Sequence, residues 1–228
     1  AAASGGDVRR ALTLFENAYL SSEGDALLLS DVTPFESNIT EYSDDIHFDL
    51  LSALQKSIRG SDPDAAVFYL NKLLAAGELL AVCRRMQVIA SEDIGLAYPQ
   101  APLIVKACCD SARELGLPEA RIPLGHAAML LATLPKSNTQ HLAVDSALED
   151  VRAGLGLVPP VHLQSPLFKG YKYPHDYKNH YVKQQYLPDE VKNKRYYKPL
   201  NNGREKNIVR ILLATQWCTH GNSAKYLL

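Results

Sequence analysis

The chain has 228 residues, 46% of them hydrophobic and 21% charged, which is enough to bury the core of one or two globular domains. Its net charge is -1, its apolar runs are much shorter than the ~20 residues of a membrane helix, and its start does not resemble a secretory signal, so we expect a cytoplasmic protein without a membrane partner. The four cysteines lack C-x-x-C spacing and fit reduced thiols better than a disulfide or zinc framework: Cys83, Cys108, Cys109 and Cys218.

The first predicted element is a helix within residues 4–16, which starts after Gly6. Asp7 can cap this helix, and the N-terminus of a helix favours anions. An arginine at this position, either Arg9 or its neighbour Arg10, offers several N–H donors to phosphate oxygens. Taken alone, however, these residues fit an ordinary capped surface helix equally well, and this is the simpler interpretation.

Apolar residues recur at helical spacing from residue 48 to residue 153. The first helix ends at Gly60, and the next is capped either by Ser61, with Asp64 completing a capping box, or by Asp62, with Pro63 as the first helical residue. Glycine or proline lies near the later boundaries. We therefore expect an all-α fold of stacked helical hairpins, with helices over residues 48–59, 63–77, 79–90, 99–115, 119–134 and 137–153.

Beyond Gly154 the helical pattern gives way to a segment rich in Tyr, Lys and Pro, and only residues 203–217 resume a helical rhythm. Residues 166–210 hold 11 of the 24 Lys and Arg residues but 4 of the 25 Asp and Glu residues, together with seven of the 12 tyrosines. We predict an extended C-terminal strap whose rings pack on the helices while its lysines stay in water. The alternative is a DNA-binding segment, in which Tyr173 stacks on bases and Lys172, Lys178 and Lys183 contact phosphates.

Two polar groups in the helical region invite a functional interpretation. Glu92 and Asp93 would be the carboxylates of a stand-alone helical enzyme that also uses His175, but adjacent helical residues point about 100° apart, so a turn that satisfies backbone donors explains them better. His175 and His180 have no third ligand at a zinc-binding spacing. We therefore predict neither a catalytic residue nor a metal site.

Two further positions are better explained by local structure. Arg59 could contact DNA, but it is better placed to pair with Asp62 or Asp64 and fix the turn between two helices. Ser137 or Asn138, which follow Pro135 and Lys136, could bind an anion at a helix start, although a plain helix cap accounts for them.

Several segments, taken in chain order, resemble the C-terminal half of the RarA/MgsA family of AAA+ ATPases, which includes the eukaryotic Werner-helicase-interacting protein. The start of the chain, with Gly6, Asp7, Arg9 and Arg10, is similar to the sensor-2 helix in the lid of such ATPases. Five later motifs extend the resemblance: residues 52–66, 89–97, 135–138, 170–176 and 185–188. The segment before Gly170 is shorter than the family usually has, and residues 211–228 match no family feature.

The resemblance implies three regions: the remnant of an AAA+ lid at 1–45, a helical oligomerisation domain at 46–165, and a basic, tyrosine-rich segment with a C-terminal helix at 166–228. It implies that Arg9, or alternatively Arg10, senses the nucleotide in the full-length protein. The chain has no G-x-x-x-x-G-K-[ST] loop, so we expect it to have no cofactor and no ATPase activity of its own, while the full-length protein uses ATP and Mg.

The resemblance also implies partners. The chain is expected to form a homotetramer, to which residues 125–134 and 70–80 contribute, because the hairpins offer more apolar faces than a thin helical layer can hide. The full-length protein is expected to bind DNA and to act in replication, recombination and repair at stalled or gapped forks, as a nucleoid-associated cytoplasmic ATPase. Single-stranded-DNA-binding protein is an expected partner.

Overall fold

The structure, a computed structural model, describes residues 44–215 except residue 167, together with Leu12, Phe15 and Tyr19. Arg9, Arg10 and most of the predicted lid remnant at 1–45 lie outside the described residues. Within these residues the secondary structure is entirely helical, which confirms the predicted all-α class. No helix among them is both long and apolar enough to span a bilayer.

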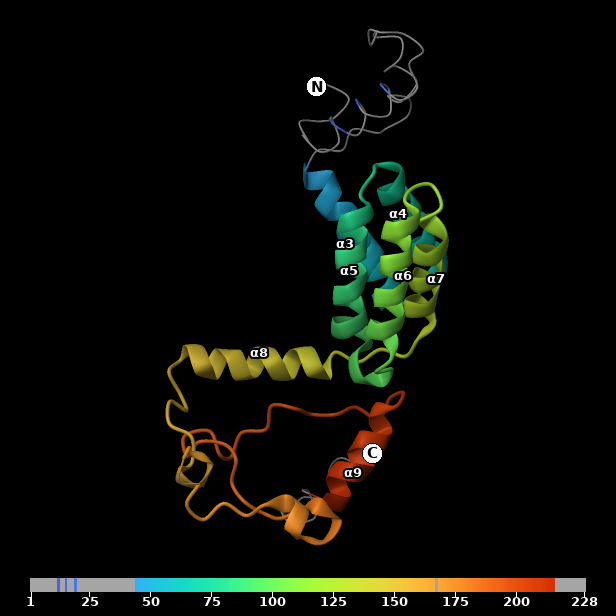
Figure 1. The fold of residues 1–228 in the computed structure, drawn as a ribbon. Helices are drawn as coiled ribbons and strands as arrows, with labels where there is room; N and C mark the ends of the chain where they lie inside the picture. Colours follow the sequence, from blue (N-terminus) through green and yellow to red (C-terminus); the bar gives the residue numbers. More distant parts are fainter. Residues whose placement is uncertain (1–11, 13–14, 16–18, 20–43, 167, 216–228) are drawn as a thin grey trace.

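Five helices form an upright bundle (Figure 1). They are α3 (Asp44–Arg59), α4 (Pro63–Ala75), α5 (Leu79–Ile89), α6 (Ala101–Leu115) and α7 (Arg121–Thr133). Their bounds agree with the predicted ranges to within a few residues, because the apolar spacing and the Gly and Pro boundaries are local signals. The core lies between them, and its largest fully buried side chains include Leu54, Ile58, Leu70, Met86, Leu124 and Leu131.

The start of α4 settles the choice between two caps. The backbone N–H of Ala65 donates to Asp62 Oδ1 over 2.9 Å, and Pro63 is the first helical residue. Asp62 is therefore the cap, and the capping box with Ser61 and Asp64 is not formed. Ser61 instead has a left-handed backbone (φ 59°), and its hydroxyl accepts a hydrogen bond from Lys136.

The end of α5 departs from a regular α-helix. Residues Ala90–Ile94 form a π-helical turn, η2, and residues Gly95–Ala97 form a 3-10 turn, η3. A π-helical turn carries an extra residue per turn and redirects the chain. Here it places the side chain of Asp93 in the buried base of the bundle.

Beyond the bundle the chain forms an open frame (Figure 1). Helix α8 (Thr139–Arg152) runs across the base of the bundle, and a strap with three short 3-10 turns follows it: η4 (Val161–Leu163), η5 (Pro174–Asp176) and η6 (Lys178–His180). The strap leads to α9 (Glu205–Thr215), which begins close to the bundle base. The helix predicted at 203–217 is thus present over 205–215.

Candidate functional site

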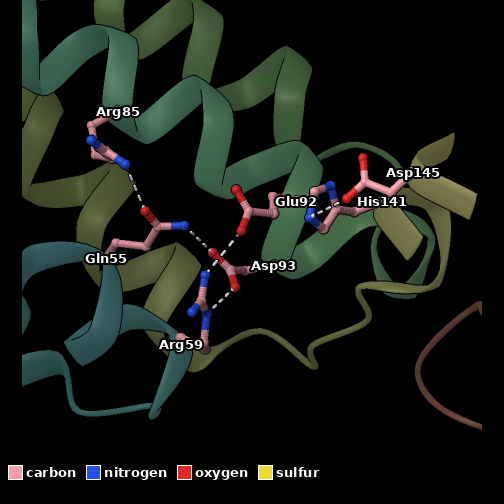
Figure 2. A network of polar contacts seen from close by, with 7 residues as sticks. All are labelled: Gln55, Arg59, Arg85, Glu92, Asp93, His141 and Asp145. Carbon is pink, nitrogen blue, oxygen red and sulfur yellow. Dashed lines mark hydrogen bonds and ion pairs between the residues drawn. The ribbon is translucent and has the colours of Figure 1, made fainter. Parts of the chain in front are cut away.

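A network of polar side chains joins α3 to the π-helical turn at the base of the bundle (Figure 2). Arg59 Nε donates to Asp93 Oδ1 over 2.5 Å, and Arg59 Nη2 donates to Glu92 Oε1 over 3.0 Å. Gln55 Nε2 donates to Asp93 Oδ2 over 3.1 Å, and Arg85 Nη1 donates to Gln55 Oε1 over 2.9 Å. The hydrogen bond from Arg59 to Asp93 raises the pKa of Arg59 above its usual value, despite the opposing effect of burial.

This network corrects two predictions from the sequence. Arg59 pairs with Glu92 and Asp93, more than 30 residues away, and these ion pairs replace the expected local pairing with Asp62 or Asp64. The buried carboxylate of Asp93 accepts from side chains of α3, whereas we expected it to satisfy backbone donors. Gln55 and Arg59 are four residues apart on one helix, a spacing that marks them as neighbours but does not identify their partner.

Residues 135–139 form the next layer of contacts below this network. The backbone N–H of Ser137 donates to the carbonyl of Asp93 over 2.8 Å. Lys136 Nζ donates to Ser61 Oγ and to the carbonyls of Ala132 and Leu134 at the end of α7. Desolvation by burial lowers the pKa of Lys136, with a smaller opposing effect from Asp93.

A fully buried carboxylate, that of Glu205, attaches α9 to the first turn of α8. Its Oε2 accepts from Ser137 Oγ over 2.6 Å, and its Oε1 accepts from Thr139 Oγ1 over 2.5 Å and from Tyr197 OH over 2.9 Å. Burial, followed by the contact with Glu205, raises the pKa of Tyr197 well above its usual value. Ser137 thus holds a buried acid from the C-terminal part of the chain as well as lying beside Thr139 N, at 3.4 Å.

Backbone contacts complete this attachment, which we call the Glu205 clasp (Ser137, Thr139, Tyr197, Gly203 and Glu205). The backbone N–H of Arg204 donates to the carbonyl of Ala97 over 2.8 Å. Gly203 has φ 51° and lies so close to this carbonyl that a Cβ atom would collide with it. Sequence reasoning missed Glu205, because an acidic residue at a helix start normally indicates only a favourable helix dipole.

A groove of about 440 Å³ lies beside the polar network and α8. It is lined by Arg59, Glu92, Asp93, Lys136, Ser137, Asn138, His141, Leu142 and Leu200. Its charged groups are paired with one another or with a neighbour, since Arg59 binds Glu92 and Asp93, and His141 lies 3.2 Å from Asp145 (Figure 2). The histidine near Glu92 is His141, whereas His175 stacks with Tyr173 and His180 in the strap. The trio required by the enzyme alternative is therefore not assembled.

Helix α8 presents an apolar face to solvent. Val144, Leu148 and Val151 follow one another at spacings of four and three residues, so they share one side of the helix. These side chains are 61%, 40% and 67% exposed. Thr139, in the first turn, is the buried residue of this helix. By contrast, the segments expected to form an interface, 125–134 and 70–80, place most of their apolar side chains in the bundle core, including Leu70, Leu73, Ala127, Ala128 and Leu131.

The candidate DNA-binding residues all lie in the strap. Lys172, Lys178 and Lys183 are exposed, and Tyr173 is 53% exposed, so in the single chain its ring does not pack on the helices as the strap prediction required. The strap itself is held at other points: Lys194 pairs with Asp150, Tyr196 OH donates to Asp150 Oδ2 over 2.7 Å, and Val191 is buried near Gly156.

Comparison with known proteins now bears on these features. A family profile described as "MgsA AAA+ ATPase C terminal" matches residues 60–216, most of the chain. The chain belongs to this family. The match covers the bundle from the end of α3 onward, α8, the strap and α9, so the Arg59 network, the Glu205 clasp and the exposed face of α8 all lie in the family's C-terminal region.

Curated members of this family are substantially similar to the chain. It is 46% identical over 224 residues to "Replication-associated recombination protein A" of Bacillus subtilis, covering 90% of this chain and 53% of the relative. It is 36% identical over 222 residues to the protein of that name in Escherichia coli K12, covering 89% and 50%. It is also 34% identical over 172 residues to "ATPase WRNIP1" of Dictyostelium discoideum, covering 71% and 20%. These matches confirm the resemblance inferred from the motifs, and the chain spans about half the length of the bacterial relatives.

Proposed function

We propose that this chain is the oligomerisation region of a RarA-type AAA+ ATPase and that it assembles as a homotetramer through α8. The observation that carries the proposal is the exposed apolar face formed by Val144, Leu148 and Val151. Transferring a Val or Leu side chain from water to an apolar interface contributes about 1.5–3 kcal/mol. An isolated helix of 14 residues is also marginally stable in water, so α8 gains stability when a second copy covers it.

The names of the relatives support the wider role. Several are called replication-associated recombination protein A, and one is called an ATPase. We propose that the full-length protein is a DNA-dependent ATPase, that it uses ATP and Mg, and that it acts at stalled or gapped replication forks in the nucleoid. In this proposal the described chain performs no ATP hydrolysis and holds four ATPase modules together. DNA and single-stranded-DNA-binding protein are its proposed partners.

The assembly is tested by the mass of the chain in solution. Light scattering over a dilution series is expected to give about four times the 25.1 kDa of one chain. Leu148→Asp, which places a charge in the apolar face, is expected to lower this mass, because a desolvated and unpaired carboxylate is costly.

Ser146→Asp is the matched control, since it adds the same charge at an exposed position of α8 away from the apolar face. It should leave the mass unchanged. A parent chain with a mass near 25.1 kDa throughout the series would refute the tetramer, and equal effects of the two substitutions would refute the role of α8.

The proposed nucleotide sensor is tested in the full-length protein. Arg9→Ala is expected to lower ATP turnover by about 10²-fold or more without changing the mass of the assembly, because a charged donor to phosphate stabilises developing charge and does not contribute to packing. Steady-state turnover at saturating ATP and light scattering measure the two effects. Arg10→Ala is the parallel variant, and normal turnover in Arg9→Ala with a loss in Arg10→Ala would move the sensor to Arg10.

A further inference from the structure

Residues 168–183 of the strap combine aromatic and basic side chains on an exposed surface. In 16 residues they hold Phe168 and four tyrosines, together with four lysines, two histidines and a single acidic residue, Asp176. Phe168, Tyr171, Tyr173 and Tyr177 are all exposed. In Figure 1 the strap passes on the far side of α8 from the bundle, so this segment does not share the bundle's core.

The segment has a defined shape although it buries little. Gln184 closes it as a loop, since the side-chain amide of Gln184 donates to the carbonyl of Lys172 over 2.8 Å and accepts from the N–H of Lys172 over 3.2 Å. Within the loop the ring centroids of Tyr173 and His175 lie 5.0 Å apart, and those of His175 and His180 lie 5.1 Å apart. The loop therefore presents a row of neighbouring rings to solvent.

The lysines of this loop differ from others in the chain. Lys106 pairs with Asp110, Lys192 with Asp189 and Lys194 with Asp150. Among the described residues, by contrast, Lys169, Lys172, Lys178 and Lys183 form no ion pair. Four uncompensated ammonium groups around a row of rings form a locally positive surface, which attracts an anionic partner.

We propose that residues 168–183 bind single-stranded nucleic acid, with Tyr173 stacking on a base and Lys172, Lys178 and Lys183 contacting phosphates. A single strand offers both the regularly spaced anions and the open base faces that this surface matches, whereas a duplex keeps its base faces stacked internally. Packing against the same loop of a second copy would bring like charges together and is disfavoured for that reason. The proposal goes beyond tetramer formation and does not depend on it.

The charge component is tested with the 228-residue chain and a fluorescently labelled single strand of poly-deoxythymidine. Replacing Lys172, Lys178 and Lys183 together by Gln is expected to weaken binding and to reduce the slope of log affinity against log salt by about 2, since each phosphate contact on a single strand contributes about 0.7. The matched control replaces Lys56, Lys106 and Lys192 by Gln, which changes the net charge equally at exposed positions outside the loop. It should leave the slope unchanged.

The stacking component is tested with Tyr173. Tyr173→Ala is expected to weaken binding about 5- to 100-fold, the effect of losing one stacked base, whereas Tyr173→Phe, which keeps the ring, should retain parental affinity. Thermal melting of each variant establishes that the chain remains folded, and the melting temperature of the triple lysine variant should equal that of the parent.

Three results would overturn the proposal. One is the absence of measurable binding by the parent chain, and another is an equal loss of affinity in the two triple-lysine variants, which would reflect net charge alone. The third is an unchanged affinity combined with a lower mass for the triple variant in light scattering, which would identify a second copy as the partner of the loop. Because the readout is DNA binding, its failure is distinguishable from failure of α8-mediated assembly, which leaves the mass of the parent at that of one chain.

Discussion

Replacing Glu205 by Ala is expected to release α9 and the end of the strap from the bundle. The carboxylate is fully buried and accepts from Ser137, Thr139 and Tyr197. Removing it leaves three hydroxyl donors without their acceptor in a space closed to water, and hydrogen bonds to a charged group each contribute about 1.5–3 kcal/mol. Since the hydroxyls can partly rehydrate once the segment opens, we expect a loss of roughly 3–5 kcal/mol in the stability of the clasp.

Hydrogen exchange measures this loss locally. The N–H of Arg204, which donates to the carbonyl of Ala97, should lose at least about 100-fold in protection, because 1.4 kcal/mol corresponds to a factor of ten. Glu205→Gln, which keeps the shape and one acceptor oxygen, should lose less. Glu114→Ala, at an exposed position of α6, is the control and should leave the protection of Arg204 unchanged. Parental protection in Glu205→Ala would show that the clasp does not hold α9.

Asp93→Ala is expected to destabilise the bundle as a whole by roughly 2–4 kcal/mol. The substitution leaves the buried amide of Gln55 without its acceptor and removes the stronger partner of Arg59. Breaking a buried ion pair by removing one partner costs about 3–5 kcal/mol, but Arg59 is half exposed and water can solvate it, so the lower part of that range applies. Chemical denaturation at a fixed protein concentration measures the change.

Asp110→Ala provides the matched control. Asp110 also pairs with two basic side chains, Lys106 and Arg113, but it does so on the exposed surface of α6. Exposed pairs of this kind contribute about 0–1 kcal/mol, so the expected loss is several times smaller than that of Asp93→Ala. Equal losses in the two variants would show that the buried network does not stabilise the joint between α3 and the π-helical turn.

The helices of the bundle could be located from sequence because their signals are local. Apolar spacing defined α4 to α8 to within a few residues, and Asp62 with Pro63 gave one of the two possible starts of α4. The ordered motifs from residue 52 to residue 188 were specific enough to indicate the family, which the profile match over residues 60–216 confirms. Each of these inferences rests on residues close together in the chain.

Pairings across the fold required the tertiary structure. Periodicity states which residues share a face of a helix, but a face can pack against any element that the chain brings to it. Arg59 therefore seemed suited to Asp62 or Asp64, two acids in the next turn, although the fold delivers Glu92 and Asp93 through the π-helical turn. Glu205 gave no sign of burial, because its partners Ser137 and Thr139 lie more than 60 residues earlier.

The same reason explains the exposed surfaces. Residues 125–134 and 70–80 carry strongly apolar patterns, and the bundle uses most of those side chains in its own core. The apolar residues of α8 are fewer, yet they stay exposed because α8 leaves the bundle and crosses its base (Figure 1). Sequence by itself determined the all-helical class, the helix boundaries and the family, since hydrophobic spacing and turn residues act over a few positions. Which apolar faces remain free, and which charges find a partner, was decided by tertiary structure, since burial depends on elements that meet only after the chain has folded.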